Sequence, residues 1–244
     1  MEWIEPDWPA PRGVRAYSTT RQGGLSCGPY ESFNLGDQVG DQPEAVRQNR
    51  ARLRRCLELP GEPHWLRQVH GCAVAQIGAD APGCAADAVL TEEAGRVCAV
   101  LTADCLPLLL TDSQGHQVAA VHGGWRGLAG GVIEATLERF RAPARELLCW
   151  LGPAIGPQAF EVGEEVRAVF LEQIGPAAGK AFRHRAPGRW FGDLYLLARL
   201  RLQAAGVQQI YGGGFCTFQD RRRFFSYRRD GITGRMATLI WKEE

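Results

Sequence analysis

Short apolar runs separated by Gly and Asp dominate the middle of the chain. They follow one another between residues 73 and 122, as AVAQI, DAVLT, VCAVLT, LPLLLT and QVAAVH. Runs of this length that are bounded by turn residues are typical of buried strands. Further strands are predicted at residues 13–20, 147–151, 208–215, 223–227 and 236–241.

Apolar residues at helical spacing predict a helix that begins near residue 43. Val46, Leu53 and Leu57 fall on one stripe, Asp41 is suited to cap the helix, and Pro43 suits its first turn. Because helices and strands are mixed without strict β-α-β alternation, we expect an α+β fold with a mixed sheet rather than a doubly wound one. Further helices are predicted at 127–141, 161–174 and 193–205, the last with Asp193 as its cap.

Residues 21–40 are rich in Gly and Ser and predict a long loop. Tyr30, Phe33 and Leu35 give this loop apolar side chains to pack, so we expect it to be ordered. Long loops inside a compact domain are usually functional or disordered. We therefore take Asn34, in the same loop, as a candidate residue that covers a cleft and contacts substrate.

Composition excludes several classes of protein. The 244 residues suffice for one sizeable core, and we expect a single domain over 1–244. The net charge of +1 argues against a dedicated nucleic-acid-binding protein. No apolar run approaches the roughly 18–20 residues that span a bilayer. The acidic, proline-broken start MEWIEPDWPAPRG lacks the features of a secretory signal, so a cytoplasmic protein is expected.

Three residues that can bind a metal stand beside predicted strand ends. They are His70 in RQVHG, Cys105 in LTADCLPLLL and His122 in AVHGGWRG. Two imidazoles and a thiolate suit zinc, and three protein ligands leave a fourth position for water or substrate. The separations along the chain are long, however, and a buried thiol with two hydrogen-bonded histidines would satisfy the same pattern.

Acidic and polar neighbours extend this candidate site. Asp104 adjoins Cys105 and would act either as a proton carrier or by orienting a metal-bound histidine. Asp87 could do the same, although a structural Asp in a turn is the commoner case. On an extended chain Gln68 faces the same side as His70, which makes it a candidate substrate-binding residue.

The sequence resembles the bacterial YfiH family, also called the DUF152 or polyphenol-oxidoreductase laccase family. The resemblance runs nearly end to end and includes TTRQGGLSCGPYESFNLG, RQVHG, ADAVLT, LTADCLPLLL, AVHGGWRGLAGGV, LGPAIGPQAFEVG and FFSYRRDGITGRMATLIW. It implies one zinc ion held by His70, Cys105 and His122. It also implies a layered α/β sandwich related to the catalytic domain of cytotoxic necrotizing factor.

The resemblance implies two different activities. One is purine nucleoside processing, which comprises phosphorolysis of adenosine, inosine, guanosine and methylthioadenosine, together with adenosine deamination. The other is multicopper laccase activity. A multicopper set calls for roughly ten histidines and a cysteine, and the chain has five histidines. We therefore favour the purine assignment and keep polyphenol oxidation with a single copper as an alternative.

Phosphorolysis also needs an anion site, for which arginine is well suited. Arg126 and Arg228 are candidates, as is Arg50, which falls on the apolar stripe of the predicted helix. An arginine there either reaches an anionic ligand or buries only its stem. The expected partners are purine nucleosides and phosphate, with no nucleic acid and no membrane, and we expect a monomer.

Two other interpretations of the same residues stay open. Cys105 and His122 could form a thiolate–imidazole pair for acyl transfer, as the related toxin fold suggests. The zinc could instead be purely structural, which requires a fourth protein ligand. His64 and Cys72 are the nearest spare ligands in the sequence.

Overall fold

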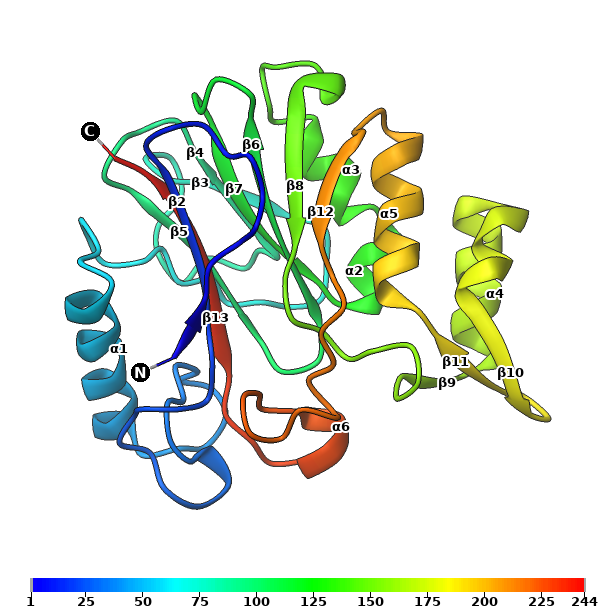
Figure 1. Ribbon diagram of the computed structural model, residues 1–244, viewed down its shortest axis with the longest axis horizontal. Coiled ribbons are helices and arrows are strands. Elements are labelled where there is room, and N and C mark those ends of the chain that lie inside the picture. Colours follow the sequence, from blue (N-terminus) through cyan, green and yellow to red (C-terminus); the bar gives the residue numbers. More distant parts are fainter. Residues whose placement is uncertain (1, 244) are drawn as a thin grey trace.

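A six-stranded mixed sheet forms the centre of the computed structural model, which describes residues 2–243 (Figure 1). The strand order is β12-β8-β6-β7-β4-β3. β12 runs parallel to β8 and β3 runs parallel to β4, whereas the other neighbours are antiparallel. The strands are β3 (Val74–Gln76), β4 (Ala88–Thr91), β6 (Leu106–Asp112), β7 (Val118–Gly123), β8 (Leu147–Leu151) and β12 (Gln209–Gly212).

A second sheet, with the order β1-β2-β13-β5, packs on one face of the first. Side chains alternate between the two faces of a strand. In β5, Cys98 and Val100 face the six-stranded sheet, whereas Val97 and Ala99 face the opposite way, in the same cluster as Leu53 of α1 (Pro43–Cys56). The strands are β1 (Trp3–Ile4), β2 (Val14–Thr19), β5 (Val97–Thr102) and β13 (Met236–Lys242).

Helices cover the other face of the six-stranded sheet and complete a layered sandwich (Figure 1). Alongside them, α4 and the three-stranded sheet β10-β11-β9 project from the body of the molecule. The helices are α2 (Trp125–Gly130), α3 (Val132–Leu137), α4 (Glu164–Ile174), α5 (Leu194–Ala204) and α6 (Tyr227–Asp230); the projecting strands are β9 (Glu161–Gly163), β10 (Phe182–Ala186) and β11 (Arg189–Gly192).

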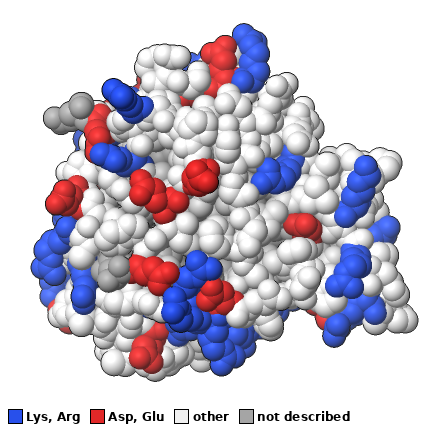
Figure 2. Space-filling model, viewed as in Figure 1, with Lys and Arg blue, Asp and Glu red and all other residues white. Residues whose placement is uncertain are grey.

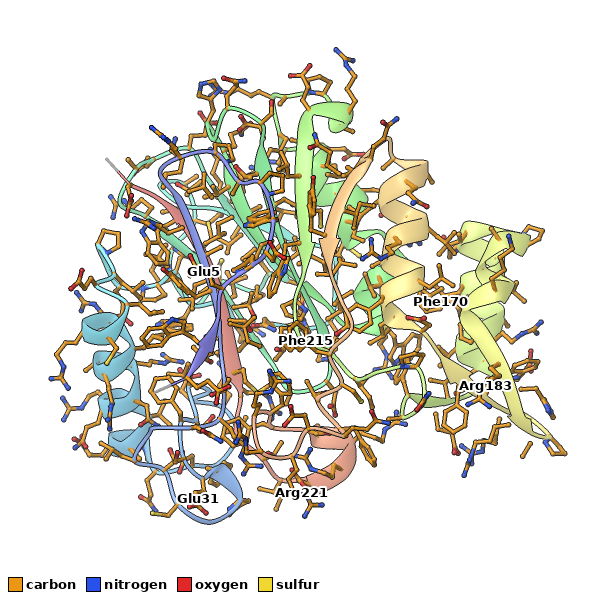
Figure 3. The ribbon with its side chains drawn as sticks, in the orientation of Figure 1. Glu5, Glu31, Phe170, Arg183, Phe215 and Arg221 are labelled. Carbon is orange, nitrogen blue, oxygen red and sulfur yellow. The ribbon has the colours of Figure 1, made fainter. Side chains whose placement is uncertain are left out.

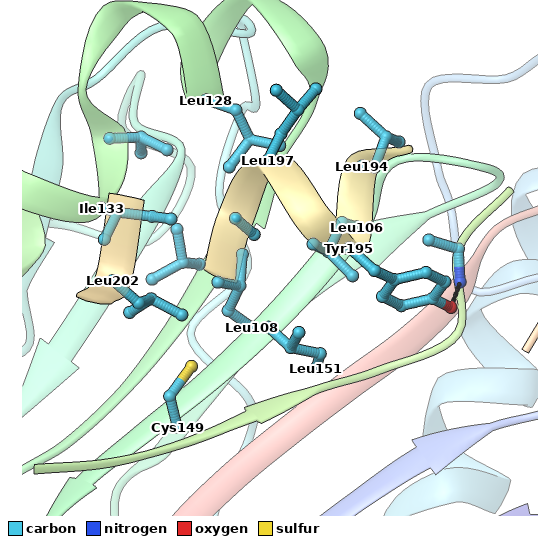
Figure 4. Packing of buried hydrophobic residues seen from close by; sticks show 14 of the residues in the cluster. Leu106, Leu108, Leu128, Ile133, Cys149, Leu151, Leu194, Tyr195, Leu197 and Leu202 are labelled. Carbon is cyan, nitrogen blue, oxygen red and sulfur yellow. Dashed lines mark hydrogen bonds between the residues drawn. The ribbon is translucent and has the colours of Figure 1, made fainter. Parts of the chain in front are cut away.

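Leucines from the sheet and from α5 build the largest part of the core (Figure 4). Leu106 and Leu108 of β6 face the helices, where Leu197 and Leu202 of α5 meet them with no exposed surface. The buried hydroxyl of Tyr195 accepts a hydrogen bond from the backbone N–H of Ala154 at 2.9 Å. A buried tyrosine needs such a partner, because an unsatisfied hydroxyl would destabilise the core.

The mixed α/β architecture with several sheets confirms the predicted α+β class, but three predicted elements are wrong. The helix predicted over 127–141 is two short helices, because Gly131 adopts a left-handed φ of 100° between them. The strand predicted over 223–227 is absent, since Phe224 and Phe225 are buried by tertiary packing and the chain then enters α6. The start of the helix predicted over 161–174 is strand β9.

The helix caps agree with the sequence in one case and differ in the other. Asp193 accepts a hydrogen bond from the N–H of Leu196, which confirms it as the cap of α5. Asp41 does not cap α1, because Gln42 occupies that position. The carboxylate of Asp41 instead accepts hydrogen bonds from the side chains of Ser26 and Asn34 within the long loop. No helix among residues 2–243 is long and apolar enough to cross a bilayer.

We expect Asp193→Ala to lower the free energy of unfolding by about 1 kcal/mol, because the N–H of Leu196 loses its partner at the start of α5. Urea denaturation followed by circular dichroism measures the change. Asp193→Asn keeps an acceptor oxygen and serves as the matched control. Equal stability of the Ala and Asn variants would count against the capping role.

Candidate metal centre and its cavities

A single buried carboxylate joins the two segments that carry the histidines. Asp87, just before β4, has no exposed surface. It accepts hydrogen bonds from the backbone N–H groups of Val69, His70 and Gly71, at 3.2, 2.9 and 2.7 Å. Its Oδ1 also accepts a hydrogen bond from Nδ1 of His122 at 2.8 Å. Asp87 therefore fixes the His70 loop and the His122 ring together.

Strand register accounts for the position of His122 and Cys105. β4 and β6 both pair with β7, so that Ala88 lies opposite Val121 and Pro107 lies opposite His122. Asp87 thus stands beside the end of β7 on one side, and Cys105, just before β6, stands beside it on the other. Because Nδ1 of His122 donates to Asp87, its Nε2 is left to face the thiol.

The structure brings His70, Cys105 and His122 together. Their donor atoms all lie within 4.8 Å of one another, and Sγ of Cys105 lies 3.8 Å from Nε2 of His70. Zinc ligands at about 2.0–2.3 Å in a tetrahedral site lie about 3.3–3.8 Å apart, so the distance between Cys105 and His70 already suits a shared ion. A Cβ atom on Gly124 would lie 2.8 Å from Cδ2 of His70 and 3.4 Å from Sγ of Cys105, so glycine is needed to keep this space open.

The three side chains also polarise one another. Burial raises the pKa of the Cys105 thiol, but the charge of His122 and hydrogen bonds from both histidines outweigh burial and lower it to about 6. Burial lowers the pKa of His122, whereas the Cys105 thiolate and Asp87 outweigh it and raise it to about 9. The donor set thus supplies a thiolate at neutral pH, which is the form that binds a metal.

Two cavities meet at this centre. The larger, of about 450 Å³, is bordered by His70, Cys105 and His122 and by residues of the long loop, including Asp37. The smaller, of about 230 Å³, is bordered by His70 and Cys105 but not by the long loop. Tyr227, which is 62% exposed, borders both cavities.

The predicted residues Gln68 and Asn34 differ in position. Gln68 borders the larger cavity, and its amide exchanges two hydrogen bonds with the backbone of Leu101. Asn34 does not face the cavity, because its side chain is fully buried and bonds to Gly36, Asp41 and Arg235. It shapes the loop that borders the cavity and is not placed to contact substrate.

Arg50 does not border either cavity at the metal centre. Its Nε donates to the carbonyl of Leu35, its Nη2 lies 3.4 Å from a carboxylate oxygen of Asp37, and its guanidinium stacks over Trp65 at 4.3 Å. Burial lowers the pKa of this guanidinium. The side chain therefore holds the long loop against α1, and the interpretation of Arg50 as an anion ligand stays a prediction, with no support from either cavity at the metal centre.

Asp104 borders the smaller cavity, but its carboxylate is engaged elsewhere. It accepts hydrogen bonds from the hydroxyls of Thr217 and Ser226 and from the N–H of Arg228, at 2.5, 3.0 and 2.6 Å. One role predicted for Asp104 was to orient a metal-bound histidine. Asp87 performs that role instead. Asp104 instead ties α6 to the turn that carries Cys105.

Arg126 and Arg228 border the smaller cavity, as an anion site beside the metal centre requires. The guanidinium of Arg126 stacks over Trp125 at 4.5 Å. That of Arg228 lies over Phe160 at 5.5 Å and donates to the carbonyl of Glu161. Both arginines are exposed, so their remaining donors face solvent.

Several residues of the site were not among those predicted from the sequence. Arg235 borders the larger cavity, and the exposed side chain of Tyr227 borders both cavities. Arg235 follows a turn that contains Thr and Gly in the C-terminal segment. Because it is far from the metal ligands along the chain, no local motif connected it with them. The two glycines after His122 were a signal for Gly124, because backbone without side chains suits close approach.

The two spare ligands do not join the cluster. Within residues 2–243, the group of side chains close enough to share an ion is His70, Cys105 and His122. His64 is buried beside β5, where its backbone N–H bonds to the carbonyl of Val97. The thiol of Cys72 donates to the carbonyl of Gly127 instead. The observed geometry therefore does not support a structural zinc site with a fourth protein ligand.

The layered sandwich and the three-donor centre define an α/β protein with a candidate metal site. Comparison with known proteins identifies its family. Residues 15–243 match the family described as multi-copper polyphenol oxidoreductase laccase, and the chain belongs to this family. It is 51% identical to purine nucleoside phosphorylase PA4543 of Pseudomonas aeruginosa, with 99% of each chain covered. It is 49% identical to purine nucleoside phosphorylase YfiH of Escherichia coli, with 98% of each covered.

Solved structures show the same fold. The chain is similar to Neisseria meningitidis protein NMB0706 of the DUF152 family, with 46% identity, a TM-score of 0.95 and 100% of each chain covered. YlmD from Geobacillus stearothermophilus is 33% identical with a TM-score of 0.95, covering 100% of this chain and 97% of that one. The predicted family and its mixed α/β fold are thereby confirmed, whereas the relation to cytotoxic necrotizing factor stays a prediction.

We expect Asp87→Asn to weaken zinc binding by about 10- to 100-fold. An amide has only one acceptor oxygen, so it cannot accept the hydrogen bonds of the loop N–H groups and also the one that holds His122 in a single tautomer. Competition with a chromophoric chelator measures the affinity. Asp112→Asn is the matched control, since Asp112 is also buried and accepts backbone hydrogen bonds, but in the turn before Gln117. Equal zinc affinity of the two variants would sink the role given to Asp87.

Metal-free protein should be alkylated at Cys105 with a rate that falls as the pH drops through about 6, since protonation removes the thiolate. Mass spectrometry after timed exposure to iodoacetamide measures the rate, with the exposed thiol of Cys27 as internal reference. A midpoint near the ordinary value for a free thiol, roughly pH 8.5, would contradict the proposed polarisation.

Proposed function

We propose that this chain is a zinc-dependent purine nucleoside phosphorylase. It cleaves adenosine, inosine, guanosine and methylthioadenosine to free base and ribose-1-phosphate or methylthioribose-1-phosphate, and it also deaminates adenosine. The observation that carries the proposal is the three-donor centre on the wall of the 450 Å³ cavity, a volume suited to a small ligand. Relatives that match nearly the whole chain at about half identity are named purine nucleoside phosphorylases.

The donor set fits zinc better than copper. His70, Cys105 and His122 would hold the ion, which supplies Lewis acidity and lowers the pKa of a bound water. A blue-copper site has the same three ligands but adds a long axial ligand, usually Met. The sulfur of Met236 accepts a hydrogen bond from the N–H of Phe225, in a different cluster. Single-copper polyphenol oxidation therefore remains the weaker alternative.

Phosphorolysis forms a bond between a phosphate oxygen and C1′ of the ribose as the C1′–N9 bond breaks. The electron pair of that bond goes to the purine, which gains the proton that hydrogen phosphate loses. The nucleoside occupies the larger cavity, where Gln68 and Arg235 form part of the wall. Phosphate meets Arg126 and Arg228 in the smaller one. Asp104, which borders that cavity, stays a prediction as the proton carrier.

Cys105, His122 and Asp87 also lie in the order of a thiol, an imidazole and an orienting carboxylate. This arrangement favours a second candidate function, acyl transfer with Cys105 as nucleophile. Zinc on the same sulfur would block it. The metal content of protein purified without added metal separates the two candidates.

We propose the following setting for the enzyme. Its partners are purine nucleosides and phosphate, and it acts as a monomer of one domain, residues 1–244, in the cytoplasm. A net charge of +1 offers no general field for nucleic acid. Among residues 2–243, no helix has the length and apolar character needed to span a membrane.

We expect protein purified without added metal to carry about one zinc per chain, the number that three such ligands hold, and Cys105→Ala to lose it. Purine release should require phosphate and yield ribose-1-phosphate, and His122→Ala should abolish it. Elemental analysis and chromatography of the products measure both, and Cys27→Ala is the control.

Distinct outcomes would overturn distinct parts of the proposal. Equal turnover by the His122→Ala variant and the natural protein would indicate a contaminating phosphorylase. Base release without phosphate would indicate hydrolysis. A zinc-free protein whose Cys105 is alkylated stoichiometrically would favour acyl transfer.

A further inference from the structure

A groove of about 770 Å³ adjoins the smaller cavity. It lies between α2, α4 and the projecting sheet β10-β11-β9, on whose outer part Figure 2 shows mainly basic charged side chains. Aromatic rings form part of its wall, among them Trp125, Phe160 and Phe191. Its charged lining consists of four arginines and two glutamates, namely Arg126, Arg185, Arg189, Arg228, Glu161 and Glu165.

Most of the positive charge in this groove is uncompensated. Arg185 pairs with Glu161 at 2.5 Å. Within residues 2–243, Arg126, Arg189 and Arg228 form no ion pair with any acidic side chain. Three exposed guanidinium groups therefore share the groove with one remaining carboxylate, that of Glu165. This excess of positive charge favours an anionic ligand.

The groove reaches the metal centre by a path separate from the larger cavity. Arg126, Arg228 and Phe160 border both the groove and the smaller cavity, and the smaller cavity extends to His70 and Cys105. The groove and the larger cavity share no lining residue. The centre is thus approached from two sides, one bordered by the long loop and the other by arginines.

We infer that phosphate, the co-substrate, enters through this groove and binds where the groove joins the smaller cavity, with Arg189 of β11 as a third anion-binding residue beside Arg126 and Arg228. The inference rests on the proposed function and deepens it. Planar guanidinium groups donate paired hydrogen bonds to phosphate oxygens. Because the nucleoside occupies a different cavity, either substrate can bind first.

Steady-state kinetics of the zinc-loaded full chain test the inference. Arg126→Gln and Arg189→Gln should each raise the KM for phosphate by about 10- to 100-fold, the effect of losing one charged hydrogen bond, and leave the KM for nucleoside unchanged. Arg189→Lys should recover part of the loss. Arg183→Gln removes the same charge from β10 (Figure 3), where Arg183 lies over the ring of Phe191 at 4.8 Å but does not itself border the groove, and should leave both KM values unchanged.

Calorimetric titration with inorganic phosphate, and separately with adenosine 5′-monophosphate, gives a readout independent of turnover. Loss of phosphate binding in the Arg126→Gln and Arg189→Gln variants supports the inference. Unchanged binding in them, with loss in Arg235→Gln, places phosphate in the larger cavity and overturns it. Groove-dependent binding of the nucleotide alone also overturns it, since the ligand is then a phosphate ester.

The same titration separates this inference from the proposed function. If the natural protein shows no phosphorolysis but binds inorganic phosphate in a manner that depends on Arg126 and Arg189, the proposed function fails and the anion site stands. If phosphorolysis proceeds with an unchanged phosphate KM in both variants, the function stands and the groove is not its phosphate site.

Discussion

The Asp87 carboxylate, buried among hydrogen-bond donors, sets the geometry of the metal centre. Burying a charge destabilises a protein unless the charge is fully hydrogen-bonded. Here three consecutive backbone N–H groups and the His122 imidazole satisfy it. These contacts hold His70 at a left-handed φ of 61°, a conformation that a non-glycine residue adopts only when its surroundings enforce it. One side chain thereby fixes the position of one ligand and the tautomer of another.

The layered architecture explains why the third ligand stands in the same place. β5 belongs to the four-stranded sheet and β6 to the six-stranded sheet, so the turn that carries Cys105 is the crossover between the two layers. Asp104, in that turn, anchors the C-terminal segment through three hydrogen bonds. Tyr227, which comes directly after Ser226, borders both cavities. The seam between the sheets is thus where the thiol of Cys105 and both proposed substrates would meet.

The two approaches to this centre differ in whether their arginines are free to bind an anion. Arg50 and Arg229 carry the same group as Arg126, yet Arg50 donates to one backbone carbonyl and Arg229 to several, and each lies beside a carboxylate. Each of them stabilises a loop. Arg126 and Arg189 lack such partners among the described residues and stand exposed in the groove. The function of an arginine in this protein therefore depends on which acceptors the fold places beside it.

Local patterns and motifs were enough to predict the family, the α+β class, the main strands, the cap of α5 and the identity of the three donor residues. Other features depend on contacts between segments that are distant along the chain. Asp87 rather than Asp104 orients His122, since strand register places it there. Asn34 and Arg50 hold a loop, since packing buries them. Phe224 and Phe225 form no strand, because their side chains are buried in the core while their backbone pairs with no neighbouring strand. Hydrogen-bond partners distant along the chain leave no local pattern.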